Sequence, residues 1–219
     1  MKPARVVVID CPWQYNNRYD TRSKSKFGIG VAARYSRGVM TEEELIALGP
    51  AIRAVCTPDA YLFSWSTRPT LDQSMRVLKA WGFKFVTMPI TWVKLYKDGT
   101  LFKGPGRYTF SNPEDLLLGR FKGSECWHPN TGWKPESVIQ TVHPRCEKGK
   151  IIHSRKPEEV QDALDRWLRP YAGDATFLEL FATRPKDEWT CYGYDVTGRD
   201  IREDLEGMAA QIELEALAE

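Results

Sequence analysis

Short apolar runs of the kind that form buried strands alternate along this chain with stretches whose apolar residues recur at helical spacing. The predicted strands cover residues 6–9, 61–65, 83–93, 116–118, 138–142, 176–181 and 189–196. Four helices are predicted. The first follows a capping box formed by Thr41 and Glu44, and the others cover residues 71–81, 157 to about 168, and 200–217. This alternation favours an α/β fold over a helical bundle or a β-sandwich.

The first predicted strand, Val6–Ile9, ends in the tetrapeptide Asp10-Cys11-Pro12-Trp13. The Asp10 carboxylate and the backbone carbonyl of Cys11 can each accept a hydrogen bond from an exocyclic amine, and Trp13 offers a face for stacking. The turn therefore suits a flat ring that carries an amino group. The same residues also suit a strand end whose acid caps a turn and whose tryptophan belongs to the core, so the motif needs support from the rest of the chain.

The length of 219 residues fits one domain, 1–219, with substrate loops near 14–40, 96–112 and 122–136. No apolar stretch reaches the length of a membrane helix, and the short N-terminal run ends at Asp10, as a strand does and a signal peptide does not. Five widely spaced cysteines are typical of reduced thiols in a cytoplasmic protein. We therefore expect a cytoplasmic protein that has no membrane partner.

The net charge of +2 does not by itself indicate a nucleic-acid-binding protein. The distribution of the charges says more, because four cations follow closely after the Asp10 turn: Arg18, Arg22, Lys24 and Lys26. A basic loop beside a candidate site suits a polyanionic substrate. Any one of these side chains is equally consistent with a solvated loop.

Seven segments, in order along the chain, resemble the MT-A family of S-adenosylmethionine-dependent adenine-N6 methyltransferases. This family includes the catalytic subunit of the eukaryotic messenger-RNA adenosine methyltransferase and shorter bacterial and phage relatives. The segments are DCPW (10–13); Tyr35 with MTEEEL (40–45); YLFSWSTRPTL (61–71); AWGFKF with TWVK (80–85, 91–94); NPEDLLLGRFKG (112–123); HSRKPEEV (153–160); and FLELFATR with WTCYGYDV (177–196). The resemblance extends from about Val6 to Val196.

The resemblance implies a permuted Rossmann-like class I methyltransferase fold, with a mostly parallel sheet and helices on both faces. The catalytic strand comes first in the chain and the cofactor strand comes late. It also implies S-adenosylmethionine as cofactor, with ligands at the carboxyl ends of the strands. The residues expected at the cofactor are Asp10, Lys156, Phe181, Arg184, Tyr194 and Asp195. Lys156 would meet the methionine carboxylate, although a lysine ahead of a helix is more commonly a solvent-exposed residue, and Asp195 would end the last strand near the ribose.

The implied reaction is methyl transfer to the N6 amine of adenine in nucleic acid, DNA rather than RNA, as a single strand or with the base flipped out. Hydrogen bonds from the amine to Asp10 and to the Cys11 carbonyl would free the nitrogen lone pair, so positioning and electrostatics would supply most of the catalysis. The residues expected at the substrate are Trp13, Tyr35, Trp65, Trp92 and Lys94, with the four cations of the basic loop. Core packing is the alternative for Trp65 and Trp92.

Two positions depart from the family pattern. Cys11 replaces the first proline of the usual [DNS]-P-P-[YFW] turn, which reduces the stiffness of the turn. Tyr194 and Asp195 stand where the family usually has Asn followed by Gln or Glu, which alters the expected adenosine pocket. Two alternatives therefore stay open: a catalytically silent member that holds nucleic acid or supports a partner, and a methyltransferase for another amine such as cytosine N4. The sequence leaves open whether the protein is a homo- or hetero-oligomer.

Four zinc-type ligands fall within one region of the sequence: Cys126, His128, His143 and Cys146. The spacing between the two pairs is not that of a standard zinc finger, and His143 lies next to a predicted strand. We therefore expect no bound metal.

Overall fold

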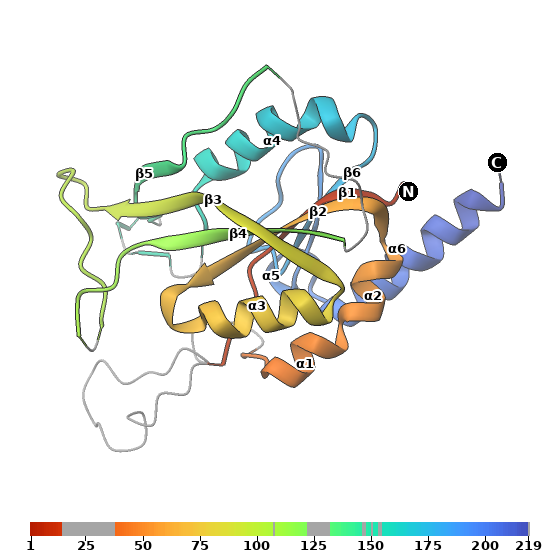
Figure 1. Ribbon diagram of the computed structural model, residues 1–219, viewed down its shortest axis with the longest axis horizontal. Helices are drawn as coiled ribbons and strands as arrows, with labels where there is room; N and C mark the ends of the chain where they lie inside the picture. Colours follow the sequence, from red (N-terminus) through yellow and green to blue (C-terminus); the bar gives the residue numbers. More distant parts are fainter. Residues whose placement is uncertain are drawn as a thin grey trace.

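The computed structural model describes residues 1–14, 38–106, 108–121, 132–145, 148–149, 151–152 and 155–218. Within these residues, seven strands form one sheet in the order β5-β3-β4-β2-β1-β6-β7 (Figure 1). They are β1 (Ala4–Ile9), β2 (Cys56–Thr67), β3 (Phe83–Leu95), β4 (Glu114–Phe121), β5 (Val138–Val142), β6 (Thr176–Leu180) and β7 (Trp189–Tyr192). Strand β4 runs antiparallel to β2 and β3, and the other neighbouring pairs are parallel. The prediction of a mostly parallel sheet is confirmed.

Helices cover both faces of this sheet (Figure 1). They are α1 (Glu42–Ala47), α2 (Gly49–Ala54), α3 (Leu71–Ala80), α4 (Glu158–Ala172), α5 (Tyr194–Thr197) and α6 (Ile201–Ala216), with a 3-10 turn, η2, at Arg68–Thr70. Because side chains alternate along a strand, Val7 and Ile9 of β1 pack with α1, α2, α3 and α6, whereas Val6 and Val8 pack with α4. This arrangement confirms the α/β, Rossmann-like fold.

Strand β1 lies between β2 and β6, so the start of the chain is paired with a segment close to its end. Ile9 is in register with Ser64 of β2 and Leu180 of β6. The residues that follow these three strands therefore emerge together at one edge of the sheet. Because β4 is antiparallel, its first residue, Glu114, also lies at this edge, opposite Thr67.

Local sequence signals mark where α1, α2 and α4 begin. The Thr41 side chain accepts a hydrogen bond from the Glu44 amide, and the Glu44 carboxylate accepts one from the Thr41 amide, so the predicted capping box is confirmed. The chain then breaks into α1 and α2 at Leu48, directly before a helix with proline in its first turn. Pro157 is the residue that caps α4 and not its first helical residue.

The predicted strand 189–196 is too long. Strand β7 ends at Tyr192, and Tyr194–Thr197 forms α5. The backbone turns at Gly193, where an added Cβ would lie 2.5 Å from the Ala182 carbonyl oxygen. The apolar residues continue through Val196, so their pattern gives no sign that the backbones of Gly193 and Ala182 lie this close together.

The C-terminal helix α6 is amphipathic, as predicted. Ile201, Leu205 and Met208 are buried on one face, whereas Leu214 is 68% exposed. Asp200 caps the helix by accepting a hydrogen bond from the Arg202 amide. No helix within the described residues is long and apolar enough to cross a membrane.

Candidate active site

Four charged side chains form a buried cluster at the carboxyl edge of the sheet, which we call the ionic cluster. Lys156 Nζ lies 2.7 Å from Asp10 Oδ2 and 3.1 Å from Glu114 Oε2. Lys94 forms an ion pair with the other oxygen of Glu114. These side chains are only 9–14% exposed. The structure thus joins three residues that the sequence predicted at the site, Asp10, Lys94 and Lys156, through an acid that it did not.

The two acids of the ionic cluster have opposite pKa shifts. Burial raises the pKa of Asp10 from its ordinary value of 3.8, and the attraction of Lys156 offsets only part of this effect. Burial acts in the same direction on Glu114, but Lys156 and Lys94 outweigh it and bring the pKa down to about 2. Glu114 therefore stays ionised and holds both lysines, and Asp10 is the acid that takes up a proton more readily.

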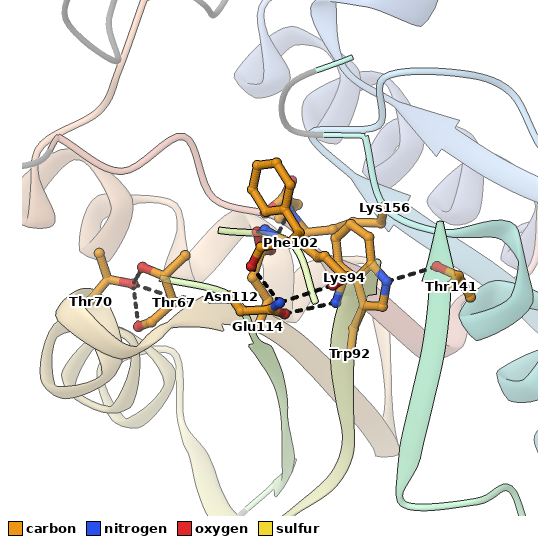
Figure 2. A network of polar contacts seen from close by, with 10 residues as sticks. Thr67, Thr70, Trp92, Lys94, Phe102, Asn112, Glu114, Thr141 and Lys156 are labelled. Atoms are coloured by element: carbon orange, nitrogen blue, oxygen red, sulfur yellow. Dashed lines mark hydrogen bonds and ion pairs between the residues drawn. The ribbon is translucent and has the colours of Figure 1, made fainter. Parts of the chain in front are cut away.

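Trp65 and Trp92 form an aromatic wall beside the cluster. Lys156 Nζ lies 5.6 Å from the centroid of the Trp65 ring, and Lys94 Nζ lies 4.8 Å from that of Trp92. The two rings meet edge to face at 6.2 Å, and Trp92 Nε1 donates a hydrogen bond of 2.8 Å to Thr141 (Figure 2). Both indoles are core side chains that border the site, and their contact with a target base stays a prediction.

Asn112 holds the backbone on which Lys94 is mounted (Figure 2). Its Oδ1 accepts a 2.8 Å hydrogen bond from the Lys94 amide, and its Nδ2 donates to the carbonyls of Lys94 and Phe102 at 2.9 and 2.7 Å. Sequence reasoning missed Asn112 and Glu114 as site residues, although both stand in the segment NPEDLLLG. Their role depends on β4 being antiparallel, which the apolar pattern does not reveal.

The backbone of Met40 stabilises the Asp10 turn through two hydrogen bonds. The Met40 amide donates to the Pro12 carbonyl at 2.8 Å, and the Gln14 amide donates to the Met40 carbonyl at 3.1 Å. The Cys11 carbonyl accepts a hydrogen bond from the Trp13 amide at 2.9 Å and keeps a second lone pair. Trp13 is only 4% exposed and packs in the core. Its predicted stacking on the base and the role of the Cys11 carbonyl stay predictions.

The Cys11 side chain is buried, and this burial raises the pKa of the thiol. The neutral thiol is a poor nucleophile, so Cys11 is not expected to react through its sulfur.

A pocket of about 240 Å³ opens beside this turn, where β6 and β7 end and α6 begins. The residues that bear on its chemistry are Pro12, Met40, Phe181, Tyr194, Asp195 and Asp200. Three of them were predicted to contact the cofactor, and Asp195 reaches the pocket from α5 and not from the end of a strand. Phe181 has a φ of 59°, an unfavourable conformation for a residue with a side chain, held here by the surrounding structure.

Asp204 of α6 holds Arg199, which lines this pocket. Its carboxylate accepts hydrogen bonds from Thr197 Oγ1 at 2.7 Å and from Arg199 Nε at 2.8 Å. Asp204 is fully buried, so these contacts tie the end of α5 and the residues after it to α6.

A second, smaller and more polar pocket adjoins the ionic cluster and includes Asp10, Lys156, Glu179 and Arg184 in its lining. Gln161 lies between the last two: it donates to Glu179 Oε2 at 2.6 Å and accepts from Arg184 at 2.5 Å. Burial raises the pKa of Glu179 to about 7. Sequence reasoning missed Glu179 because it interrupts the apolar strand FLELF, where its direction cannot be read from the pattern.

Some predicted residues lie outside the part of the chain that the structure describes: Tyr35, Arg18, Arg22, Lys24, Lys26, Cys126, His128 and Cys146. His143 is described; it is buried and its ring packs against Trp92 and Phe102, at 5.6 and 5.0 Å between centroids. Among the described residues, no group of three or more His, Cys, Asp or Glu side chains is placed to hold a metal ion.

Comparison with known proteins agrees with the geometry. The MT-A70 family model matches residues 4–195, which include the whole ionic cluster and all seven strands. The type II methyltransferase M.MunI from Mycoplasma sp is 26% identical over 215 residues, which cover 94% of this chain and 83% of that protein. The chain therefore belongs to the MT-A70 family, the methyltransferases that its motifs resemble.

Proposed function

We propose that this methyltransferase moves a methyl group from S-adenosylmethionine to the N6 amine of adenine in DNA. The observation that carries the proposal is the buried Asp10 carboxylate, which Lys156 holds at 2.7 Å beside a pocket of about 240 Å³. The similarity to M.MunI, a type II methyltransferase, favours DNA over RNA as the substrate.

We assign the adenosine half of S-adenosylmethionine to the larger pocket, of about 240 Å³. The methionine half would lie against the smaller pocket, whose volume of about 10 Å³ has room for about one water molecule, so its side chains would have to move to receive this half. The larger one offers the aromatic rings of Phe181 and Tyr194 to an adenine and the carboxylates of Asp195 and Asp200 to ribose hydroxyls. S-adenosylmethionine would supply a methyl group activated by a positively charged sulfonium.

The smaller pocket places two acids and two cations together, which is the charge pattern that a zwitterionic amino acid needs. Lys156 and Arg184 would attract the methionine carboxylate, and Glu179 would attract the ammonium group. Lys156 is already bonded to Asp10 and Glu114, so it would hold the carboxylate and Asp10 at the same time.

The residues of the Asp10 turn would orient the target amine. An adenine amine is a poor nucleophile because its lone pair is delocalised into the ring. Asp10 and the Cys11 carbonyl each retain acceptor capacity, so they can accept one N–H hydrogen each and draw the nitrogen towards tetrahedral geometry. Lys156 would keep Asp10 in place during this step. As the N–C bond forms, the bond between the methyl group and the sulfonium breaks and leaves a neutral thioether, and the methylated nitrogen releases one proton to Asp10 or to water. No strong general base is required, because the cationic methylated amine is acidic and positioning supplies most of the effect.

The test is to identify the methylated nucleoside. The purified protein is given labelled S-adenosylmethionine with single-stranded DNA, duplex DNA or RNA of mixed sequence, and the polymers are then digested. We expect N6-methyladenine, in DNA. N4-methylcytosine as the product would contradict the proposed target, and label in RNA alone would contradict the proposed polymer. A protein that transfers no label and does not bind S-adenosylmethionine in calorimetry would be the silent scaffold.

A further inference from the structure

We propose that residues 96–106 and 108–112, between β3 and β4, form an arm that binds unpaired nucleotides of the substrate next to the active site. We call this segment the ribbon. The inference rests on the proposed nucleic-acid substrate and adds to it a contact surface whose chemistry can be tested separately.

The ribbon is a built structure with its own hydrogen bonds. Gly104 and Ser111 exchange two backbone hydrogen bonds, of 2.8 and 3.1 Å, in the manner of an antiparallel strand pair. An added Cβ at Gly104 would lie 2.5 Å from the Ser111 carbonyl oxygen, and one at Gly106 would lie 1.9 Å from that of Thr109. The two backbone segments are thus in contact, and only glycine fits at both positions.

Three large apolar side chains project from this ribbon into solvent. Tyr108 is 90% exposed, Phe110 is 69% exposed and Leu101 is 58% exposed. Large exposed apolar surface rimmed by polar residues is a feature of interaction sites, and these three side chains belong to one short segment. Two of the three are aromatic, and aromatic faces stack on unpaired bases of any sequence.

The charges of the ribbon favour a polyanionic occupant over an apolar partner or a second copy of the chain. Lys103 Nζ lies 5.5 Å from the centroid of the Phe110 ring, and Lys97 is also exposed. The acid of the ribbon, Asp98, accepts hydrogen bonds from the amide and the hydroxyl of Thr100 within a turn. Cations beside exposed aromatic rings are the combination that proteins use to bind single strands.

The base of the ribbon is part of the active site. Asn112 bonds the backbone of Lys94, which belongs to the ionic cluster, and the carbonyl of Phe102, which belongs to the ribbon. The Phe102 ring packs between Tyr96 and His143, at 5.2 and 5.0 Å. Nucleotides stacked on the ribbon would therefore be continuous with a base held at Asp10.

The experiment measures the affinity of the full chain for a fluorescently labelled single-stranded DNA by anisotropy. Tyr108→Ala and Phe110→Ala are compared with Leu214→Ala, a truncation on α6 that is 68% exposed in the wild type. We expect each ribbon variant to bind about fivefold or more weakly, because one base–aromatic stack is lost, and the control to bind as the wild type does. Lys103→Gln should reduce the dependence of affinity on salt.

Unchanged affinity in both aromatic variants would overturn the inference, as would a wild type that binds no single-stranded DNA. A wild-type dimer that the two variants dissociate, seen by sedimentation, would assign the ribbon to a second copy of the chain and would also overturn it. Methyl transfer by the same wild-type preparation tests the proposed function independently. A protein that methylates DNA while its ribbon variants bind normally would contradict the ribbon alone.

Discussion

At the scale of single residues, Glu114 explains why two lysines can be buried beside Asp10. Its carboxylate forms ion pairs with both, and its pKa of about 2 keeps it ionised at neutral pH. A buried charge is costly unless it has a partner of opposite charge. Removing the Glu114 carboxylate would leave Asp10 as the remaining acid of the ionic cluster beside its two buried lysines.

We therefore expect Glu114→Gln to lower kcat for methyl transfer at least tenfold and to destabilise the fold by about 3 kcal/mol or more, because it breaks buried ion pairs. Glu136→Gln, an exposed carboxylate lost by the same change, is the matched control and should behave as the wild type. Steady-state kinetics and urea unfolding measure both effects. A Glu114→Gln enzyme with wild-type kcat would show that the acid does not position Lys156.

Glu179 gives a pH dependence whose sign can be derived. Its pKa is 4.5 ordinarily and about 7 in the folded protein, so the folded state holds this proton more tightly than the unfolded state. The protonated Glu179 side chain therefore contributes to the free energy of unfolding. This contribution is fully present below about pH 4.5 and is lost as the pH rises through 7. Its size is about 3 kcal/mol.

Urea unfolding at pH 5 and pH 8, without cofactor, should show that the wild type loses more stability over this interval than Glu179→Gln does. The variant keeps the shape of the side chain and has no proton to lose. Equal losses in the two proteins would mean that Glu179 titrates normally.

Among the elements, the pocket that we propose for S-adenosylmethionine depends on how closely β7 and α5 approach the end of β6. An added Cβ at Gly193 would lie 2.5 Å from the Ala182 oxygen and 2.7 Å from its nitrogen, both of them backbone atoms. Neither atom can move without distorting the wall that carries Phe181.

Gly193→Ala should therefore weaken binding of S-adenosylmethionine and cost about 1–3 kcal/mol of stability through overpacking. The control is Gly207→Ala in α6, where an added Cβ meets nothing within 4 Å. That change should stabilise the protein by about 0.5–1 kcal/mol, because alanine favours the helix. Calorimetric titration and thermal unfolding give both readings, and a Gly193→Ala protein that matches the wild type would contradict the close approach.

The elements themselves were largely predictable from the sequence. Apolar periodicity located all seven strands, and the capping box at Thr41 located the start of α1. The boundary between β7 and α5 was not predictable, because contact between the backbones at Gly193 and Ala182 decides it and no side-chain pattern records such contact.

At the scale of the whole molecule, the sheet topology assembles the site from segments far apart in the chain. Asp10 and Lys156 are separated by 146 residues yet lie 2.7 Å apart, because Asp10 follows β1 and Lys156 comes just before α4, which packs on β1 (Figure 1). The resemblance to the MT-A family predicted both residues at the site. It did not predict Glu114 or Glu179, because each sits within or at the end of an apolar strand and only the strand order shows that it faces the site.

The decisive measurement is methyl transfer by Asp10→Ala, with binding of S-adenosylmethionine measured on the same sample. We expect transfer to DNA to be abolished while the cofactor still binds, because Asp10 is proposed to orient the amine and does not line the larger pocket of about 240 Å³ that we assign to the adenosine half. Asp10→Asn, which keeps the shape but removes the charge that Lys156 pairs with, should also lose most of the activity. Near-native turnover in Asp10→Ala would show that Asp10 does not orient the amine.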